Sequence, residues 1–202
     1  TSINTIRAEE MGILEQVRIA RGDASRSVQW YQDQVREVVG TAYTGAQFQR
    51  EYAENLTNRM LPGRMYLIHY ANPVTRDKLP YFDKFPLILP FNIESNLVTA
   101  INFHYLHPVQ RIILLEKLSR FKVGDRDIST RIRADWDILK NFSRFREVKP
   151  AVKKYRKSLI KGRLLFIKPD DWTTAAMLPT EQFRGSSKQK VWLDSNRKMR
   201  QR

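Results

Sequence analysis

The front of the chain has the apolar periodicity of amphipathic helices. In residues 2–20 apolar side chains recur at helical spacing, and Gly22-Asp23 then supplies a stop and a new cap. Residues 26–39 predict a second helix whose apolar side chains form more than one stripe, so we expect it to pack against more than one neighbour. A third short helix is predicted for residues 48–61, because Leu61 precedes a proline and residues in that position avoid helical geometry.

The middle of the chain has a strand-like pattern instead. Residues 65–70, 87–91 and 97–106 are rich in branched and aromatic side chains, and proline, asparagine and aspartate bound them. The prolines of this region fall where strands begin, end or lie at an edge. These segments predict a small, mostly antiparallel sheet.

After the sheet the pattern becomes helical again. Pro108 takes the first position of a helix with a broad apolar face, and residues 129–145 repeat apolar side chains at spacings of three and four. A further, basic helix is predicted from Pro150 to Gly162, followed by a strand over residues 164–167.

The end of the chain is predicted to hold one more short helix and a tail. Asp170 or Asp171 can cap a helix that runs to Met177, and residues 184–190 are polar and tail-like. The whole pattern predicts an α+β fold with N-terminal helices, a small mostly antiparallel sheet, and C-terminal helices with a basic tail. We divide the chain into a helical N-terminal region for assembly contacts, an α+β core and a basic C-terminal tail, at residues 1–59, 60–183 and 184–202.

Composition narrows the class of protein. The chain has 202 residues, of which 42% are hydrophobic, and this is enough for one core. No apolar run approaches the roughly 18 residues of a membrane-spanning helix, and residues 1–10 lack the pattern of a secretory signal, so we expect a soluble protein. Because there is no cysteine, disulfide frameworks, thiol nucleophiles and thiolate metal sites are excluded.

The positive charge is concentrated in the last third of the chain. Residues 1–139 carry 18 lysines and arginines against 16 acidic residues, a net charge of +2, whereas residues 140–202 carry 18 against 5, a net charge of +13. Such a surface attracts polyanions, because each cation placed near a phosphate releases condensed counterions. Nucleic acid is therefore the first candidate partner.

The predicted helix after Pro150 is the strongest candidate for a phosphate-binding surface. Its lysines recur at every fourth residue and would share one face. Contacts of this kind position a protein on a duplex without reading its sequence, although an ordinary solvated face is the simpler interpretation. The predicted nucleic-acid contacts, from this helix and the tail, are Lys153, Lys154, Lys157, Lys161, Arg163, Arg197, Lys198 and Arg200.

Two other polyanion partners stay open. An anionic membrane surface or an acidic neighbouring protein would also attract these charges. The membrane is disfavoured, because the apolar positions of the basic segment suit core packing and the sequence has no lipidation motif.

Motifs for catalysis or metal binding are weak. His104 and His107 lie three residues apart, which a strand places on opposite faces, so we expect His104 in the core and His107 near a helix start. Asp135, Asp137 and the Glu147-Val148-Lys149 run faintly resemble a metal-dependent nuclease, but both aspartates fall in a predicted helix and Lys149 precedes the proline that starts the next one. The sequence has neither a phosphate-binding glycine loop nor a Gly-x-Ser-x-Gly elbow. We expect no enzyme activity, no metal, no cofactor and no small-molecule substrate.

Several short motifs carry a resemblance to a known family. They are MYLIHY at 65–70, LPYFDKFP at 79–86, NFHYLHP at 102–108, KPAVKKY at 149–155, LPTEQF at 178–183 and VWLD at 191–194. They resemble the DNA end protectors of T-even-type myoviruses and their cyanophage relatives, over about residues 60–195, with residues 1–59 outside the resemblance.

This resemblance implies a minor virion protein of the head-to-tail region or the leading DNA end. Such a protein shields packaged linear double-stranded DNA from host exonuclease after injection. The implied partners are linear DNA or its ends and other phage structural proteins within an oligomeric assembly. The implied setting is the virion, and the host cytoplasm during assembly and after injection.

Two structural questions stay open. The aromatic-proline block at 79–86 is expected to cap the core, with Asp83 and Lys84 turned outward, and a stacking platform for a DNA end is the alternative. At the level of the whole protein, the alternative is a purely architectural tail, neck or baseplate subunit whose basic surface contacts acidic neighbouring proteins.

Overall fold

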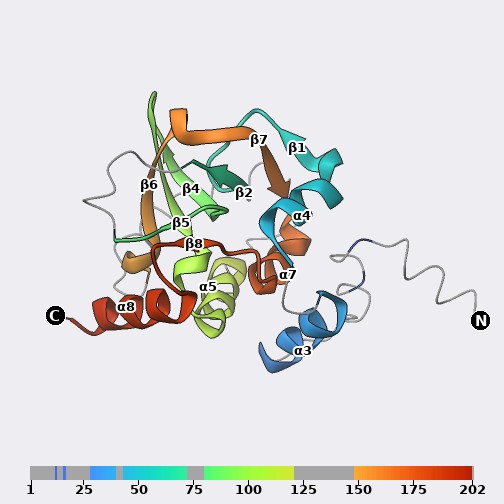
Figure 1. Ribbon diagram of the computed structural model, residues 1–202, viewed down its shortest axis with the longest axis vertical. Coiled ribbons are helices and arrows are strands. Elements are labelled where there is room, and N and C mark those ends of the chain that lie inside the picture. The colour runs from blue at the N-terminus through green and yellow to red at the C-terminus, as the bar shows by residue number, and fades with distance from the viewer. Residues whose placement is uncertain are drawn as a thin grey trace, which may run out of the picture.

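A curled sheet with helices gathered along one face makes up the fold (Figure 1). The computed structural model describes residues 12, 16, 28–39, 43–71, 80–120 and 148–201. This arrangement confirms the predicted α+β class. The helix predicted over 129–145, and nearly all of the helix predicted over 2–20, lie outside the described residues. The division of the chain into three parts remains a prediction.

Helices and short 3-10 turns alternate with the strands along the described chain. The helical elements are α3 (Val28–Val39), α4 (Gly45–Glu51), η1 (Ala53–Asn55), η3 (Phe103–Tyr105), α5 (Pro108–Arg120), η4 (Lys149–Ala151), η5 (Lys157–Leu159), η6 (Pro169–Asp171), α7 (Trp172–Met177) and α8 (Lys188–Arg200). The strands are β1 (Leu56–Thr57), β2 (Met65–Tyr70), β3 (Phe82–Asp83), β4 (Leu87–Ile93), β5 (Leu97–Asn102), β6 (Val152–Arg156), β7 (Ile160–Ile167) and β8 (Phe183–Arg184).

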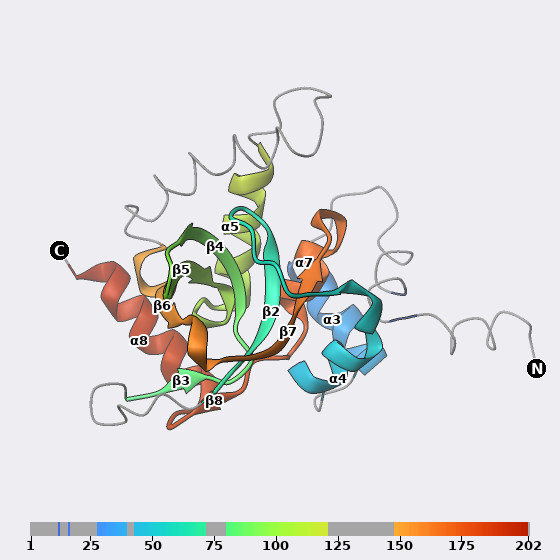
Figure 2. The same cartoon turned by 90° about the horizontal axis from the view of Figure 1, so that it is seen from above.

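The main sheet has the strand order β1-β7-β2-β4-β5-β6, and every neighbouring pair is antiparallel. The sheet curls strongly, as a contact between two of its strands shows. The rings of Tyr70 on β2 and Tyr155 on β6 meet edge to face with their centres 5.0 Å apart, although β2 and β6 are not neighbours in the sheet. A small cluster of apolar side chains fills the inside of the curl. Strands β3 and β8 form a separate two-stranded sheet (Figure 2).

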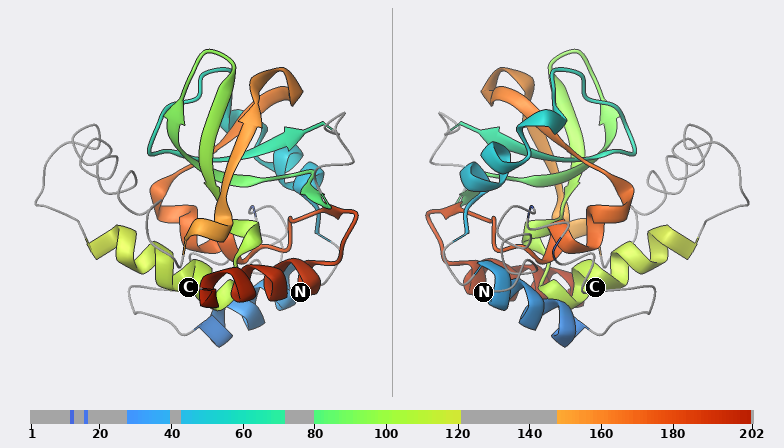
Figure 3. Two further views of the ribbon diagram at one scale, coloured as in Figure 1. Left: turned by 90° about the vertical axis from the view of Figure 1, so that its left-hand side faces the viewer. Right: turned by 90° about the vertical axis from the view of Figure 1, so that its right-hand side faces the viewer.

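The larger core lies between the sheet and the helices. Figure 3 shows α3, α5 and α8 gathered below the sheet, and their apolar side chains pack with the outer face of β2, β4 and β7. Within the described residues no helix is long and apolar enough to cross a membrane.

Most predicted elements of the front and middle are confirmed. The structure has α3 within the predicted 26–39 helix, β2 over the predicted strand, and α5 starting at Pro108. The strand predicted over 97–106 is shorter, because the Asn102 side chain accepts a hydrogen bond from the His104 amide at 3.0 Å and starts a 3-10 turn. The helix predicted over 48–61 ends at Glu51, since the chain then joins the sheet as β1.

The predicted basic helix from Pro150 to Gly162 was wrong. The segment forms β6, which pairs with β5 from Ile101–Val152 to Leu97–Arg156. This pairing satisfies the peptide groups of β5, which would otherwise form an open edge. The four-residue spacing of the lysines therefore does not describe a helical face.

Within the region expected to be a basic tail, residues 188–200 form helix α8. The Ser187 hydroxyl caps the helix by accepting a hydrogen bond from the Lys190 amide at 3.3 Å. Val191 and Ser195 are buried one turn apart, so a single face of α8 is docked on the core.

Candidate nucleic-acid interface

Strand β6 exposes a row of basic side chains along the edge of the sheet. Successive residues of a strand point to opposite faces. Lys154 and Arg156 therefore share one face and are exposed, while Lys153 and Tyr155 share the other and are half-buried and buried. Among the described residues β6 is the last strand of the sheet, so no further described strand lies beside these cations.

Lys153 lies on the face of β6 that is near helix α8. Its ammonium nitrogen lies 4.0 Å from the centre of the Tyr105 ring, in cation–π geometry. Burial lowers the pKa of Lys153 to about 8, and the nearby positive charge of Lys198 contributes to the shift. The sequence prediction listed Lys153 and Lys198 together, and the fold brings these two residues near each other. It placed Lys153 on a helix and Lys198 in a tail, whereas they lie on β6 and α8.

Helix α8 adds three exposed cations at its C-terminal end. Arg197, Lys198 and Arg200 all lie in the last turn, where positive charge interacts favourably with the helix dipole. The Gln110 amide donates to the Asn196 side chain at 2.8 Å and helps to fix the helix on α5. Lys188 and Lys190, in the first turn, instead form ion pairs with Glu181 and Asp194.

The remaining predicted contacts lie beyond the other end of β6. Lys157 is half-buried in η5, and the exposed Lys161 donates from its ammonium group to the Ser158 carbonyl at 3.1 Å. Arg163 is exposed on β7. The predicted contact residues thus extend from α8 along β6 and over η5 to β7, and do not form one compact patch (Figure 1).

A buried polar network lies behind this basic edge, and sequence reasoning missed it. The Asp83 carboxylate accepts from the Phe85 and Gln182 amides at 3.1 Å each and lies 2.7 Å from the Nδ1 atom of His104. The other ring nitrogen of His104 lies 3.2 Å from the Thr180 hydroxyl. Asp83 is only 2% exposed, so the prediction that its side chain turns outward was wrong.

The motifs of the central region converge on this network. Asn102 donates to the Tyr155 hydroxyl at 3.0 Å, and the Trp192 indole donates to the His104 carbonyl at 2.9 Å. Nearby, the buried Arg111 donates to the Leu106 and Ala176 carbonyls at 2.9 and 2.7 Å. The signal in the sequence was the recurrence of Asp, His, Asn and Thr inside otherwise apolar motifs.

The histidines behave as the sequence predicted. His104 is fully buried, and the Nδ1 atom of His107 accepts a hydrogen bond from the Val109 amide at 3.4 Å at the start of α5. Among the described residues no three histidine, aspartate or glutamate side chains are grouped as metal ligands. Asp135, Asp137 and Glu147 of the nuclease hypothesis lie outside the described residues.

The described part of the aromatic-proline block, residues 80–86, packs as a cap on the core. Phe85 is buried, and Tyr81 contacts both Tyr105 and Phe183 ring to ring, at 6.0 and 6.3 Å between centres. Phe82 is half-buried against the apolar cluster inside the curl. These contacts agree with the core-capping interpretation.

Comparison with known families agrees with the motifs. The family model described as the phage T4 terminal DNA protecting protein matches residues 3–196. The similarity therefore also includes residues 3–59, which the motifs had left outside. No curated protein and no solved structure is significantly similar to the chain. Because the match covers nearly the whole sequence, the chain belongs to the family of the phage T4 terminal DNA protecting protein.

Proposed function

We propose that the protein protects the ends of linear phage DNA by non-enzymatic, sequence-independent binding. The observation that carries the proposal is that exposed cations recur on three parts of the structure, namely the last turn of α8, strand β6 and strand β7. A protein that holds a duplex by its phosphates blocks an exonuclease sterically and needs no chemistry of its own.

The proposed contacts are the exposed cations of these elements, together with the half-buried Lys157 of η5. Arg156 joins the contacts predicted from the sequence, because it shares the exposed face of β6 with Lys154. The contribution of Lys153 is smaller, since its ammonium group lies on the Tyr105 ring. The five residues of β6 extend over about 16 Å, close to half a turn of a duplex. The contact residues are Lys154, Arg156, Lys157, Lys161, Arg163, Arg197, Lys198 and Arg200.

The proposed setting is that of a minor virion protein. It would act near the head-tail junction or in the tail, and in the host cytoplasm during assembly and after injection. Its proposed partners besides DNA are other phage structural proteins. Membership of a family described by DNA protection supports this setting.

The test is an exonuclease protection assay combined with DNA-binding measurements at several salt concentrations. Two variants neutralise the proposed surface, Lys154→Gln/Arg156→Gln on β6 and Lys198→Gln/Arg200→Gln on α8. Arg36→Gln/Arg50→Gln is the matched control, because it removes the same charge from exposed positions on α3 and α4, away from α8 (Figure 1).

The wild type and the control should protect linear duplex from digestion. Each lost phosphate contact should reduce the slope of log K against log salt by about 0.9, so each surface variant should lose up to about 1.8. If both surface variants bound DNA with the affinity and the salt slope of the wild type, this surface would be removed from the proposal.

A second candidate function is that of an architectural subunit, and one observation favours it. Val109 and Ile113 lie four residues apart on α5 and are 41% and 46% exposed. An apolar pair of this kind suits a protein neighbour better than a phosphate backbone. Assembly that is lost in Val109→Asp/Ile113→Asp, together with no protection of DNA, would favour this function.

A further inference from the structure

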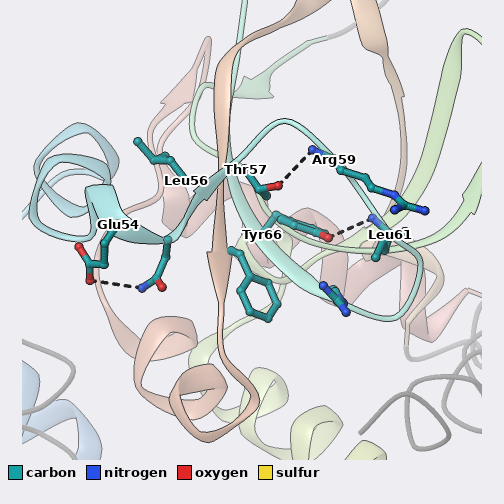
Figure 4. Close-up of a pocket in the computed structure, with 9 residues that line it drawn as sticks. Glu54, Leu56, Thr57, Arg59, Leu61 and Tyr66 are labelled. Atoms are coloured by element: carbon teal, nitrogen blue, oxygen red, sulfur yellow. Dashed lines mark hydrogen bonds between the residues drawn. The ribbon is translucent and has the colours of Figure 1, made fainter.

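A cavity of about 460 Å³ opens between β1, β2 and β7, and the DNA-contacting surface proposed above does not use it. Its volume lies within the range of roughly 300–1,000 Å³ that is typical of small-molecule sites. Figure 4 shows the side chains that line it. They are Glu54, Asn55, Leu56, Thr57, Arg59, Leu61, Arg64, Tyr66 and Phe166.

Hydrogen bonds fix the loop that forms one wall of the cavity. The Tyr66 hydroxyl accepts from the Leu61 amide at 3.0 Å, and the Thr57 hydroxyl accepts from the Arg59 amide at 3.2 Å. The turn after Pro62 depends on Gly63, which has a φ of 73° and donates to the Pro90 carbonyl at 2.9 Å. The backbone around both arginines is therefore held in place before any ligand binds.

Two arginines supply positive charge to this cavity. Arg59 is exposed, and the guanidinium carbon of Arg64 lies 5.4 Å from the centre of the half-buried Phe166 ring. Within the part of the chain that the structure describes, neither guanidinium makes an ion pair with an acidic side chain. Both groups are therefore available to an anionic ligand.

The cavity also offers a flat surface and a polar end. Nucleic-acid bases stack on aromatic rings and on the planes of arginine side chains, and Phe166 with Arg64 above it presents both. In Figure 4 Glu54 lies at the opposite end of the cavity from Arg59. A ligand with a phosphate at one end and hydrogen-bond donors at the other matches this distribution of charge.

The basic surface leads to this cavity along a single stretch of chain. From β6 the chain passes through η5 into β7, which carries the exposed Lys161 and Arg163 and then Phe166 (Figure 1). The register between β1 and β7 pairs Thr57 with Leu164, so Arg163 is adjacent to the loop that carries Arg59.

We propose that this cavity binds the phosphorylated terminal nucleotide of a DNA strand, with Arg59 on the phosphate and with the stacked Arg64 and Phe166 against the base. The inference rests on the proposed function and deepens it, because it separates recognition of an end from binding along the duplex. The same chemistry would admit a free mononucleotide, so the experiment includes one.

The experiment compares three DNA molecules of one sequence. One is a hairpin with a blunt 5′-phosphorylated end, the second is the same hairpin with a 5′-hydroxyl, and the third is a dumbbell closed at both ends. The wild type should bind the phosphorylated end about tenfold more tightly than the dumbbell. In Arg59→Gln/Arg64→Gln the affinity for the open end should fall to that for the dumbbell, whereas Arg36→Gln/Arg50→Gln should keep the preference.

Arg59→Gln alone is the second variant, because Arg59 is exposed and its replacement removes no packing. It should reduce the preference for the phosphorylated end severalfold. Equal binding of open and closed DNA by the wild type would overturn the inference, and so would an unchanged preference in the double variant. Saturation by 5′-dAMP without any preference for DNA ends would overturn it in favour of a free-nucleotide site.

The outcomes separate the two proposals. If the pocket variants keep the preference for ends while the β6 variant loses affinity for all three molecules, only the further inference fails. If the β6 and α8 variants bind like the wild type while the pocket variants lose the preference, the basic surface fails and the cavity stands.

Discussion

The Nδ1 atom of His104 lies 2.7 Å from a carboxylate oxygen of Asp83, and both side chains are at most 1% exposed. With the Thr180 hydroxyl on the other ring nitrogen, the three groups resemble the relay of a hydrolase. Solvent and substrate have no access to them, because Thr180 is also only 1% exposed. The contacts between Asp83, His104 and Thr180 instead hold together three segments that are far apart in the sequence.

Asp83→Asn should lower the free energy of unfolding by about 2–4 kcal/mol, because an amide brings a donor where the carboxylate only accepts. The loss should be measured as a lower midpoint in urea denaturation. Asp170→Asn is the matched control, since Asp170 is exposed, and it should change stability by less than about 0.5 kcal/mol. Equal effects of the two substitutions would contradict a structural role for the network.

Lys153 should make stability rise with pH. Burial lowers its pKa to about 8 in the folded protein, whereas the ordinary value is 10.5, so between these values the unfolded chain holds more protons. The cost of the buried ammonium is fully present below pH 8 and is lost as the pH approaches 10.5. Removing the ammonium should therefore help the folded state most at neutral pH.

Lys153→Met tests this linkage. Its stability relative to the wild type should be highest at pH 7 and should decline by about 1–3 kcal/mol by pH 10. Urea denaturation across this range gives the difference, and NMR of labelled lysine gives the titration directly. A difference that does not vary with pH would contradict the environment described for Lys153.

Helix α8 should contribute to the stability of the core. Val191 is fully buried, so Val191→Ala should lower the free energy of unfolding by about 1–3 kcal/mol. Leu193→Ala is the control on the same helix, because Leu193 is 52% exposed and its truncation should cost less than about 0.5 kcal/mol. Thermal denaturation of both variants makes the comparison. If the Val191 substitution had no effect, the end of the chain would behave as an undocked tail.

Local patterns predicted the elements that depend on local physics. Strand β2 matches the prediction at both ends, and α5 begins at Pro108, because branched side chains and a proline at the first turn act within a few residues. The prediction of a helix after Pro150 failed, because the conformation of this segment depends on pairing with β5, some 50 residues away in the sequence. Tyr155 and Val152 favour a strand, but the lysine spacing masked that preference.

The candidate site was predicted in part for the same reason. The sequence shows which cations exist, and most of the predicted contact residues are exposed. It does not show that Lys153 rests on Tyr105 or that Arg59 and Arg64 line a cavity, because those contacts join distant segments. Asp83 was assigned to the surface, since no local pattern reveals that His104 is its partner.

Gly162 marks the point where the mistaken helix was expected to end, and its actual role gives the last prediction. Gly162 has a φ of 69°. It lies in an irregular part of the pairing, where β7 advances by four residues, from Lys161 to Leu165, while β2 advances by two, from Leu67 to His69. Left-handed backbone geometry is thus needed for a bulge and not for a helix end. The bulge also determines how Lys161 and Arg163 leave the strand.

Gly162→Ala should lower the free energy of unfolding by about 1–2 kcal/mol through backbone strain alone, because no atom lies within 4 Å of the added Cβ. Gly162→Asn should cost less, since asparagine enters the left-handed region more readily than alanine. Urea denaturation would rank the three proteins as glycine, asparagine and alanine in order of falling stability. Alanine at least as stable as glycine would contradict the bulge, because a right-handed backbone at this position favours alanine.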